Sequence, residues 1–134
     1  MKLHFFYCTV CGKIIAVLTD TGTPTICCGK PMQELIPNRT DGSYEKHVPV
    51  FSEAGRTVTV KIGSEPHPME ESHSILWIGL RSTRGFQLRE LHPGDLPETV
   101  FSLAPGESTQ EVYAYCNLHG LWCSEPKSDI RVVR

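Results

Sequence analysis

Four cysteines near the start of the chain have the spacing of a metal site. Cys8 and Cys11 form a C-x-x-C-G motif, and Cys27 and Cys28 form an adjacent pair that is also followed by glycine. A C-x-x-C turn points two thiolates into one site, and the glycine lets backbone amides approach the sulfurs. Four thiolates suit zinc and iron equally well in geometry and softness. The alternatives are four unrelated thiols or a thioredoxin-like dithiol, and the dithiol needs a βαβ context that is missing here.

A second group of candidate ligands is spread over the rest of the chain. Its members are His47, His67 and His73, followed by Cys116 and His119 in a C-x-x-H motif. A histidine taken alone is more often a surface or satisfied residue than a ligand. C-x-x-H, however, is a usual ligand spacing, and prolines on both sides of His67 stiffen a loop there. Four histidines and one cysteine in a small β domain favour a second metal site.

The composition bounds the class of protein. The chain has 134 residues, of which 40% are hydrophobic and 21% charged, with a net charge of −2. These values are typical of a soluble globular protein, and no apolar run reaches the ~20 residues that cross a bilayer. Without a basic face a nucleic-acid partner is not expected. The N-terminus lacks a secretory signal, so we expect a cytoplasmic protein whose six cysteines serve as ligands or redox groups rather than disulfides.

The elements that must position these residues fall into two parts. Residues 1–36 hold too few apolar side chains for a sizeable core, so this part needs a staple such as a metal. Residues 36–43 are rich in Pro, Asn, Asp and Gly and are typical of a linker. Residues 37–134 are predicted to form an immunoglobulin-like antiparallel β-sandwich, because short alternating strands follow one another without a helix-length amphipathic run. The predicted strands span 48–52, 56–63, 73–82, 86–92, 98–104, 108–116 and 129–134, with turns at 53–55 and 83–85.

Several motifs resemble those of a known family. The first cysteine pair and CCGKPM resemble desulforedoxin, a small Fe(Cys)4 module whose adjacent cysteines distort the tetrahedron. DGSYEKHVPV, GSEPHPMEESHSILWI and CNLHGLW follow in the order found in desulfoferrodoxin, the two-iron form of superoxide reductase. The resemblance covers essentially the whole chain. It implies a desulforedoxin-like module over 1–36 and a superoxide reductase β-sandwich over 37–134.

The resemblance also implies roles for individual residues. It assigns an N-terminal iron to the four cysteines and a second, catalytic iron to the other group. In that second site the four histidines are equatorial ligands and Cys116 is the axial thiolate, which leaves one position open. Lys46 is expected to steer superoxide and to order a water that helps protonate the product, and Glu45 to occupy the open position in the oxidised state. The implied ligands are Cys8, Cys11, Cys27 and Cys28 for one iron and His47, His67, His73, Cys116 and His119 for the other.

The implied activity is one-electron reduction of superoxide to hydrogen peroxide without release of oxygen, as a defence against oxidative stress. We expect two irons per chain, with zinc able to replace the N-terminal iron in recombinant protein. A rubredoxin-like electron donor and a homodimer are the expected partners. Two other functions stay open from the sequence: an electron-transfer or metal-storage protein that works through its N-terminal centre, and a zinc-stapled structural module.

Overall fold

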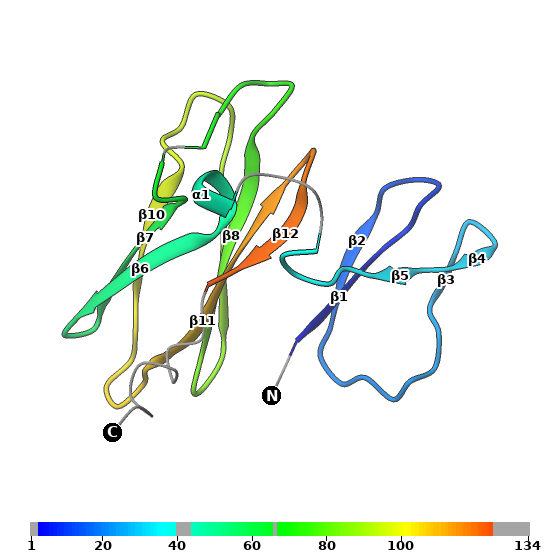
Figure 1. The fold of residues 1–134 in the computed structure, drawn as a ribbon. Coiled ribbons are helices and arrows are strands. Elements are labelled where there is room, and N and C mark those ends of the chain that lie inside the picture. The colour runs from blue at the N-terminus through cyan, green and yellow to red at the C-terminus, as the bar shows by residue number, and fades with distance from the viewer. Residues whose placement is uncertain (1–2, 40–43, 66, 125–134) are drawn as a thin grey trace. The chain divides into compact units, whose positions relative to one another are not determined.

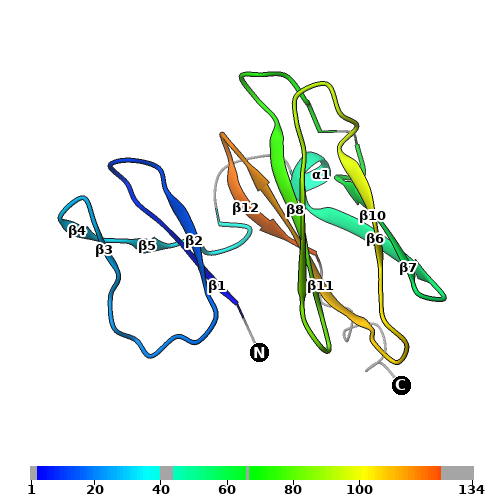
Figure 2. The same ribbon diagram turned by 180° about the vertical axis from the view of Figure 1, so that it is seen from behind.

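Short strands with alternating apolar residues account for most of the fold. A computed structural model describes residues 3–39, 44–65 and 67–124, and it confirms the mainly β prediction (Figure 1). The chain divides into two units, residues 1–36 and 37–134. Each unit has its own sheets, which can be followed from both sides in Figures 1 and 2.

The N-terminal unit is a set of short hairpins. Its three-stranded sheet has the order β2-β1-β5 and consists of β1 (His4–Tyr7), β2 (Ile14–Val17) and β5 (Gln33–Glu34). A two-stranded ribbon pairs β3 (Ile26–Cys27) with β4 (Lys30–Pro31). Among its described residues, the buried side chains are Leu3, Phe5, Cys8 and Met32. So small a core fits the expectation that something besides apolar packing holds this unit together.

The second unit is a sandwich of two antiparallel sheets. The three-stranded sheet has the order β10-β7-β6 and consists of β6 (Pro49–Ala54), β7 (Thr57–Ile62) and β10 (Glu98–Ser102). The four-stranded sheet has the order β12-β11-β8-β9 and consists of β8 (Ile75–Ser82), β9 (Phe86–Glu90), β11 (Thr109–Cys116) and β12 (Gly120–Cys123). The unit's first, second and fifth strands therefore form one sheet and the other four form the second, a division of immunoglobulin-like type.

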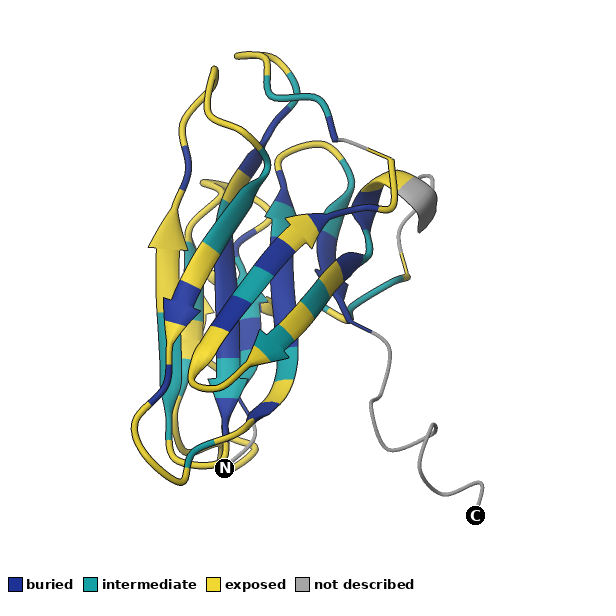
Figure 3. Ribbon diagram, turned by 90° about the vertical axis from the view of Figure 1, so that its left-hand side faces the viewer, coloured by how far each residue is buried: buried dark blue, intermediate teal, exposed yellow. Residues whose placement is uncertain are grey.

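The core of the second unit lies between these two sheets. Every second side chain of the long strands points inward, and Figure 3 shows the resulting alternation of buried and exposed residues. Val58, Val60 and Ile62 of β7 meet Val112, Ala114 and Cys116 of β11 in one buried cluster. Cys116 is the last inward position of β11, so its sulfur lies where the core reaches the end of the sandwich.

Some local predictions differ from the structure. The first hairpin turns at Gly55 and Arg56 instead of 53–55, because strand pairing continues to Ala54 opposite Thr57. The short helix α1 (Tyr44–His47) and strand β12 were not predicted, since four residues carry too little periodicity to be read. The predicted strand 129–134 and positions 40–43 of the linker lie outside the described residues. Within the part that is described, no helix has the length and apolarity to cross a membrane.

Candidate metal centres

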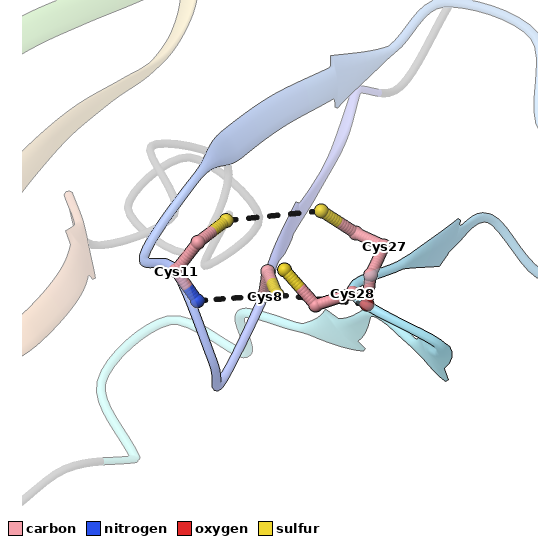
Figure 4. A group of neighbouring side chains, drawn as sticks. All are labelled: Cys8, Cys11, Cys27 and Cys28. Carbon is pink, nitrogen blue, oxygen red and sulfur yellow. Dashed lines mark hydrogen bonds between the residues drawn. The ribbon is translucent and has the colours of Figure 1, made fainter.

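The four N-terminal cysteines converge from two hairpins. Cys8 and Cys11 come from the β1–β2 turn, and Cys27 and Cys28 come from the β3–β4 turn (Figure 4). Their four sulfurs all lie within 4.8 Å of one another. Cys28 adopts a φ of 53°, a conformation that costs a non-glycine residue ~1 kcal/mol. That left-handed turn is how two adjacent cysteines present both sulfurs to one point.

The surroundings of these sulfurs fit a cation. The backbone N–H groups of Val10 and Cys11 both approach Cys8 Sγ at 3.4 Å, and these bonds lower the pKa of the Cys8 thiol to about 6. Hydrogen bonds with Cys11 and Cys8 instead raise the pKa of Cys28 to about 12. Four thiolates at one point require a positive ion to balance them.

The spacing of the sulfurs also fits a metal. Cys11 Sγ and Cys27 Sγ are 3.7 Å apart. In a regular tetrahedron with metal–sulfur bonds of ~2.3 Å the sulfurs are ~3.8 Å apart. The N-terminal group therefore has the donors and the size of a four-thiolate centre.

The second group lies at one end of the sandwich. His47 ends α1 just before β6, and His67 and His73 lie in the connection from β7 to β8. Cys116 ends β11, where it pairs with Ile75 of β8 and with Gly120 of β12. Antiparallel pairing brings these strand ends together, and ligand atoms of His47, His67, His73 and Cys116 all lie within 4.8 Å of one another.

His119 completes a ring of four imidazoles. It is not within that mutually close set, but its Nδ1 lies 3.0 Å from His47 Nε2 and 3.8 Å from Cys116 Sγ. Successive ring centroids in the order His47, His67, His73, His119 and back are separated by 4.6, 4.7, 5.0 and 4.7 Å. The ring centroids of His47 and His73, which lie on opposite sides of this group of four, are 6.2 Å apart. Four rings arranged in this way surround one point.

Two of the four imidazoles, those of His67 and His73, are prepared as neutral donors. His67 Nδ1 lies 2.6 Å from the carbonyl oxygen of Pro68, and this contact assigns the ring proton to Nδ1 and leaves the lone pair on Nε2. The buried Nε2 atoms of His67 and His73 have no hydrogen-bond partner among the residues that the structure describes. Burial lowers the pKa of His67 to about 4 and also lowers that of His73. An unpartnered buried nitrogen is costly unless something binds it, so these orphans fit metal ligation.

Cys116 supplies the negative charge of the site. Its side chain is fully buried, and burial raises the pKa of its thiol, while the backbone N–H groups of His119 and Leu118 act in the opposite direction. A bound cation would offset that burial and leave the sulfur as a thiolate. One thiolate and four imidazoles then form a mixed nitrogen and sulfur donor set, which suits a transition metal.

Two charged residues, Glu45 and Lys46, directly precede His47 in the sequence. Lys46 is exposed, and its charge contributes to the lowered pKa of His73, which places it within electrostatic reach of the ring. The side chain of Glu45 lies outside the described residues.

Two neighbours of the site, the aromatic Trp122 and the amide Asn117, make contacts that the sequence does not reveal. Trp122 is fully buried, stacks on the His47 ring at 4.7 Å, and donates from Nε1 to the carbonyl oxygen of His119 at 3.0 Å. Asn117 holds the segment that carries His73. Asn117 lies inside the C-x-x-H motif and Trp122 lies three residues after it, and neither position indicates which residues the side chain contacts.

Comparison with known proteins agrees with this geometry. The profile of the desulfoferrodoxin N-terminal domain matches residues 1–35, and the desulfoferrodoxin profile matches residues 39–125. The desulfoferrodoxin of Syntrophotalea carbinolica is 46% identical over 124 residues, covering 92% of this chain and 97% of that one. A superoxide reductase of Pyrococcus horikoshii is 37% identical over 103 residues, covering 63% of this chain and 89% of its own length.

A solved structure gives the same result. The superoxide reductase from Treponema pallidum superposes with a TM-score of 0.79 at 33% identity, covering 93% of this chain and 100% of that one. The resemblance inferred from the motifs is thereby confirmed. With matches over both units, this chain belongs to the desulfoferrodoxin family.

Proposed function

We propose that this chain is a superoxide reductase that works at the second metal centre. The observation that carries the proposal is the ring of four imidazoles closed around one point beside the buried Cys116 sulfur. Family membership and the likeness to the Treponema pallidum superoxide reductase support it. His47, His67, His73, His119 and Cys116 are the proposed ligands, and a set of five leaves room for a small anion.

Each residue proposed for the second centre has a part in this reaction. When bound here, ferrous iron supplies the single electron, and superoxide with that electron and two protons gives hydrogen peroxide. The four imidazoles stay neutral and Cys116 contributes one negative charge, so the loaded site carries a net positive charge that favours an anion. Lys46 adds an exposed positive charge that is within electrostatic reach of His73. We propose Glu45 for the remaining position in the oxidised state, on the strength of its place beside Lys46.

The same proposal extends to the cofactors and partners. We propose iron at the four-cysteine centre as well, with zinc able to replace it, because four thiolates accept both metals. The other proposed properties are a rubredoxin-like electron donor, a homodimer, a cytoplasmic location and a role in oxidative-stress defence. Metal analysis of protein from iron-replete cells tests the assignment of iron against the alternative of a zinc-stapled structural module. Two irons per chain are expected, whereas zinc at both sites would favour a structural module.

A kinetic experiment tests the enzyme and the steering role of Lys46 together. Pulse radiolysis measures the second-order rate of the reduced protein with superoxide at several salt concentrations. A local positive charge changes such an encounter rate by ~10-fold or more. Lys46→Ile should therefore be slower than wild type and less sensitive to salt, since screening acts over ~10 Å at 0.1 M.

Arg56→Ile is the matched control for this experiment. It removes the same charge from the β6–β7 turn, at the end of the sandwich away from the histidines. Its rate should stay close to wild type. No reaction of wild type with superoxide would reject the enzyme, and equal salt slopes for wild type and Lys46→Ile would reject the steering role alone.

A further inference from the structure

Asn117 binds the chain on both sides of His73. Its backbone N–H donates to the carbonyl oxygen of Ser74 at 3.2 Å, and its side-chain Nδ2 donates to the carbonyl oxygen of Ser72 at 3.1 Å. Its Oδ1 accepts a hydrogen bond from the N–H of Ser74 at 3.0 Å. One residue directly after Cys116 therefore holds both neighbours of His73.

The backbone of His73 itself is held by two hydrogen bonds with the backbone of Glu70. Its N–H donates to the carbonyl oxygen of Glu70 at 3.1 Å, and its carbonyl oxygen accepts from the N–H of Glu70 at 2.9 Å. Ser74 is 1% exposed and leads directly into β8. With these bonds in place, little backbone freedom remains to turn the His73 ring away from the other imidazoles.

The amide of Asn117 acts where the β-ladder stops. The pairing of β11 with β8 shifts register after Tyr115 and ends with Cys116 opposite Ile75. Beyond that point the side chain of Asn117 supplies a donor and an acceptor in place of the next backbone rung. The primary amide of Asn carries an N–H donor and a carbonyl acceptor on one planar group, whereas a carboxylate offers acceptors alone.

We propose that Asn117 is a positioning residue that fixes His73 relative to Cys116 for metal binding. The proposal rests on the metal centre put forward above. Asn117 is exposed, so each of its hydrogen bonds contributes only modestly to folding. Their main consequence is geometric, because the unpartnered Nε2 of His73 must be aimed at the point that the other ligands share. Removing a residue that orients a metal ligand typically weakens metal binding 10- to 100-fold, about the loss we expect here.

Chelator-buffered Zn²⁺ titration of the full chain, freed of metal beforehand, tests this proposal. Long-range ¹H–¹⁵N NMR of the histidine rings follows the second centre alone, because the four-cysteine group contains no histidine. Asn117→Ala should bind Zn²⁺ at the histidines ~10- to 100-fold more weakly than wild type, with altered His73 ring signals. Leu88→Ala is the matched control, since it truncates a leucine that is 60% exposed on β9, a strand that carries no proposed ligand. It should bind as wild type does.

Asn117→Asp serves as the conservative variant. It keeps an acceptor for Ser74 but loses the donor to Ser72, so it should recover part of the affinity, measured at 0.5 M salt to screen its added charge. Wild-type affinity in Asn117→Ala, or an equal loss in Leu88→Ala, would overturn the proposal. If Asn117→Ala does not fold, wild-type affinity in Asn117→Asp would overturn it instead. Superoxide takes no part in this titration, so failure of the proposed activity would not decide it.

Discussion

Glu111 organises a polar cluster on the outer face of the four-stranded sheet. Its Oε1 accepts hydrogen bonds from Arg81 Nε and from the Tyr113 hydroxyl, each at 2.7 Å. Its Oε2 accepts one from Cys123 Sγ at 3.6 Å. Burial, followed by the nearby carboxylate of Glu111, raises the pKa of the Cys123 thiol to about 12. Cys123 is thus a protonated structural donor, and it lies outside both clusters of cysteine and histidine ligand atoms.

This cluster predicts a loss of stability in alkali. Because the folded pKa of Cys123 lies above the ordinary value of 9.0, its contribution is complete below pH 9 and declines as the pH rises toward about 12. Urea unfolding from pH 8 to 10.5 should show a steeper decline for wild type than for Cys123→Ala, by up to ~1.4 kcal/mol per pH unit. Tryptophan fluorescence reports the second unit, since Trp77 and Trp122 both lie there. Parallel declines in the two proteins would contradict this role.

At the residue scale the sequence could indicate candidate ligands but not their supports. Cysteines and histidines stand out because C-x-x-C and C-x-x-H are spacings that metals require. Glu111 and Cys123 are 12 residues apart, and the pairing of β11 with β12 brings them together. Asn117 and Ser72 are 45 residues apart in the chain. Such contacts depend on the finished fold and leave no local pattern in the sequence.

At the scale of elements, β8 and β9 form a hairpin whose close packing depends on a glycine. The ring of Phe86 lies over Gly79, and a Cβ added at Gly79 would fall 2.5 Å from Phe86 Cζ. Residues on β9 pair with β8 over the whole length of β9, so Phe86 has little room to retreat. The absence of a side chain at Gly79 therefore lets an aromatic side chain cover this part of the sheet.

Gly79→Ala should destabilise the second unit by ~1–3 kcal/mol, because overpacking forces a ring or a strand to shift. Thermal unfolding followed by tryptophan fluorescence gives the measurement. Gly85→Ala, in the turn of the same hairpin, is the control, since among the described residues no heavy atom beyond its two chain neighbours lies within 4 Å of the added Cβ. A smaller loss in Gly79→Ala than in Gly85→Ala would show that the Phe86 ring moves aside without cost.

The strands themselves were readable from the sequence to different extents. Thr57–Ile62 alternates perfectly between apolar and polar residues, and its period indicates both the strand and its buried face. Gly120–Cys123 is too short for a period, and its inclusion in the sheet follows from the turn after Cys116. The candidate loop ligands His67 and His73 lie between strands, so the distance between their side chains depends on how the β7–β8 connection closes.

At the scale of the whole molecule, the two units are stabilised in different ways. The second unit has a buried cluster contributed by both sheets, whereas the described part of the first buries few side chains and gathers four sulfurs instead. The two sets of candidate ligands share no residue and come from different units. Metal binding at one set should therefore be separable from metal binding at the other.

Cys28→Ser should lose the N-terminal metal and leave the second centre intact. Replacing one of four thiolates removes much of the binding free energy that folds so small a unit, so residues 1–36 should become sensitive to protease. The iron content should fall from two per chain to one, while the second-order rate with superoxide stays near that of wild type.

Cys116→Ser is the reciprocal variant and Cys123→Ser is the control that removes a thiol outside both sets. Cys116→Ser should retain the four-thiolate centre and its optical spectrum but lose the reaction with superoxide, because it removes the thiolate of the other site. Cys123→Ser should keep both irons. Iron analysis, limited proteolysis and pulse radiolysis on the three variants decide whether the two metal centres function independently. A collapse of the superoxide rate in Cys28→Ser would mean that the N-terminal centre is required for the chemistry of the second, and the two units would then have to be treated as one functional body.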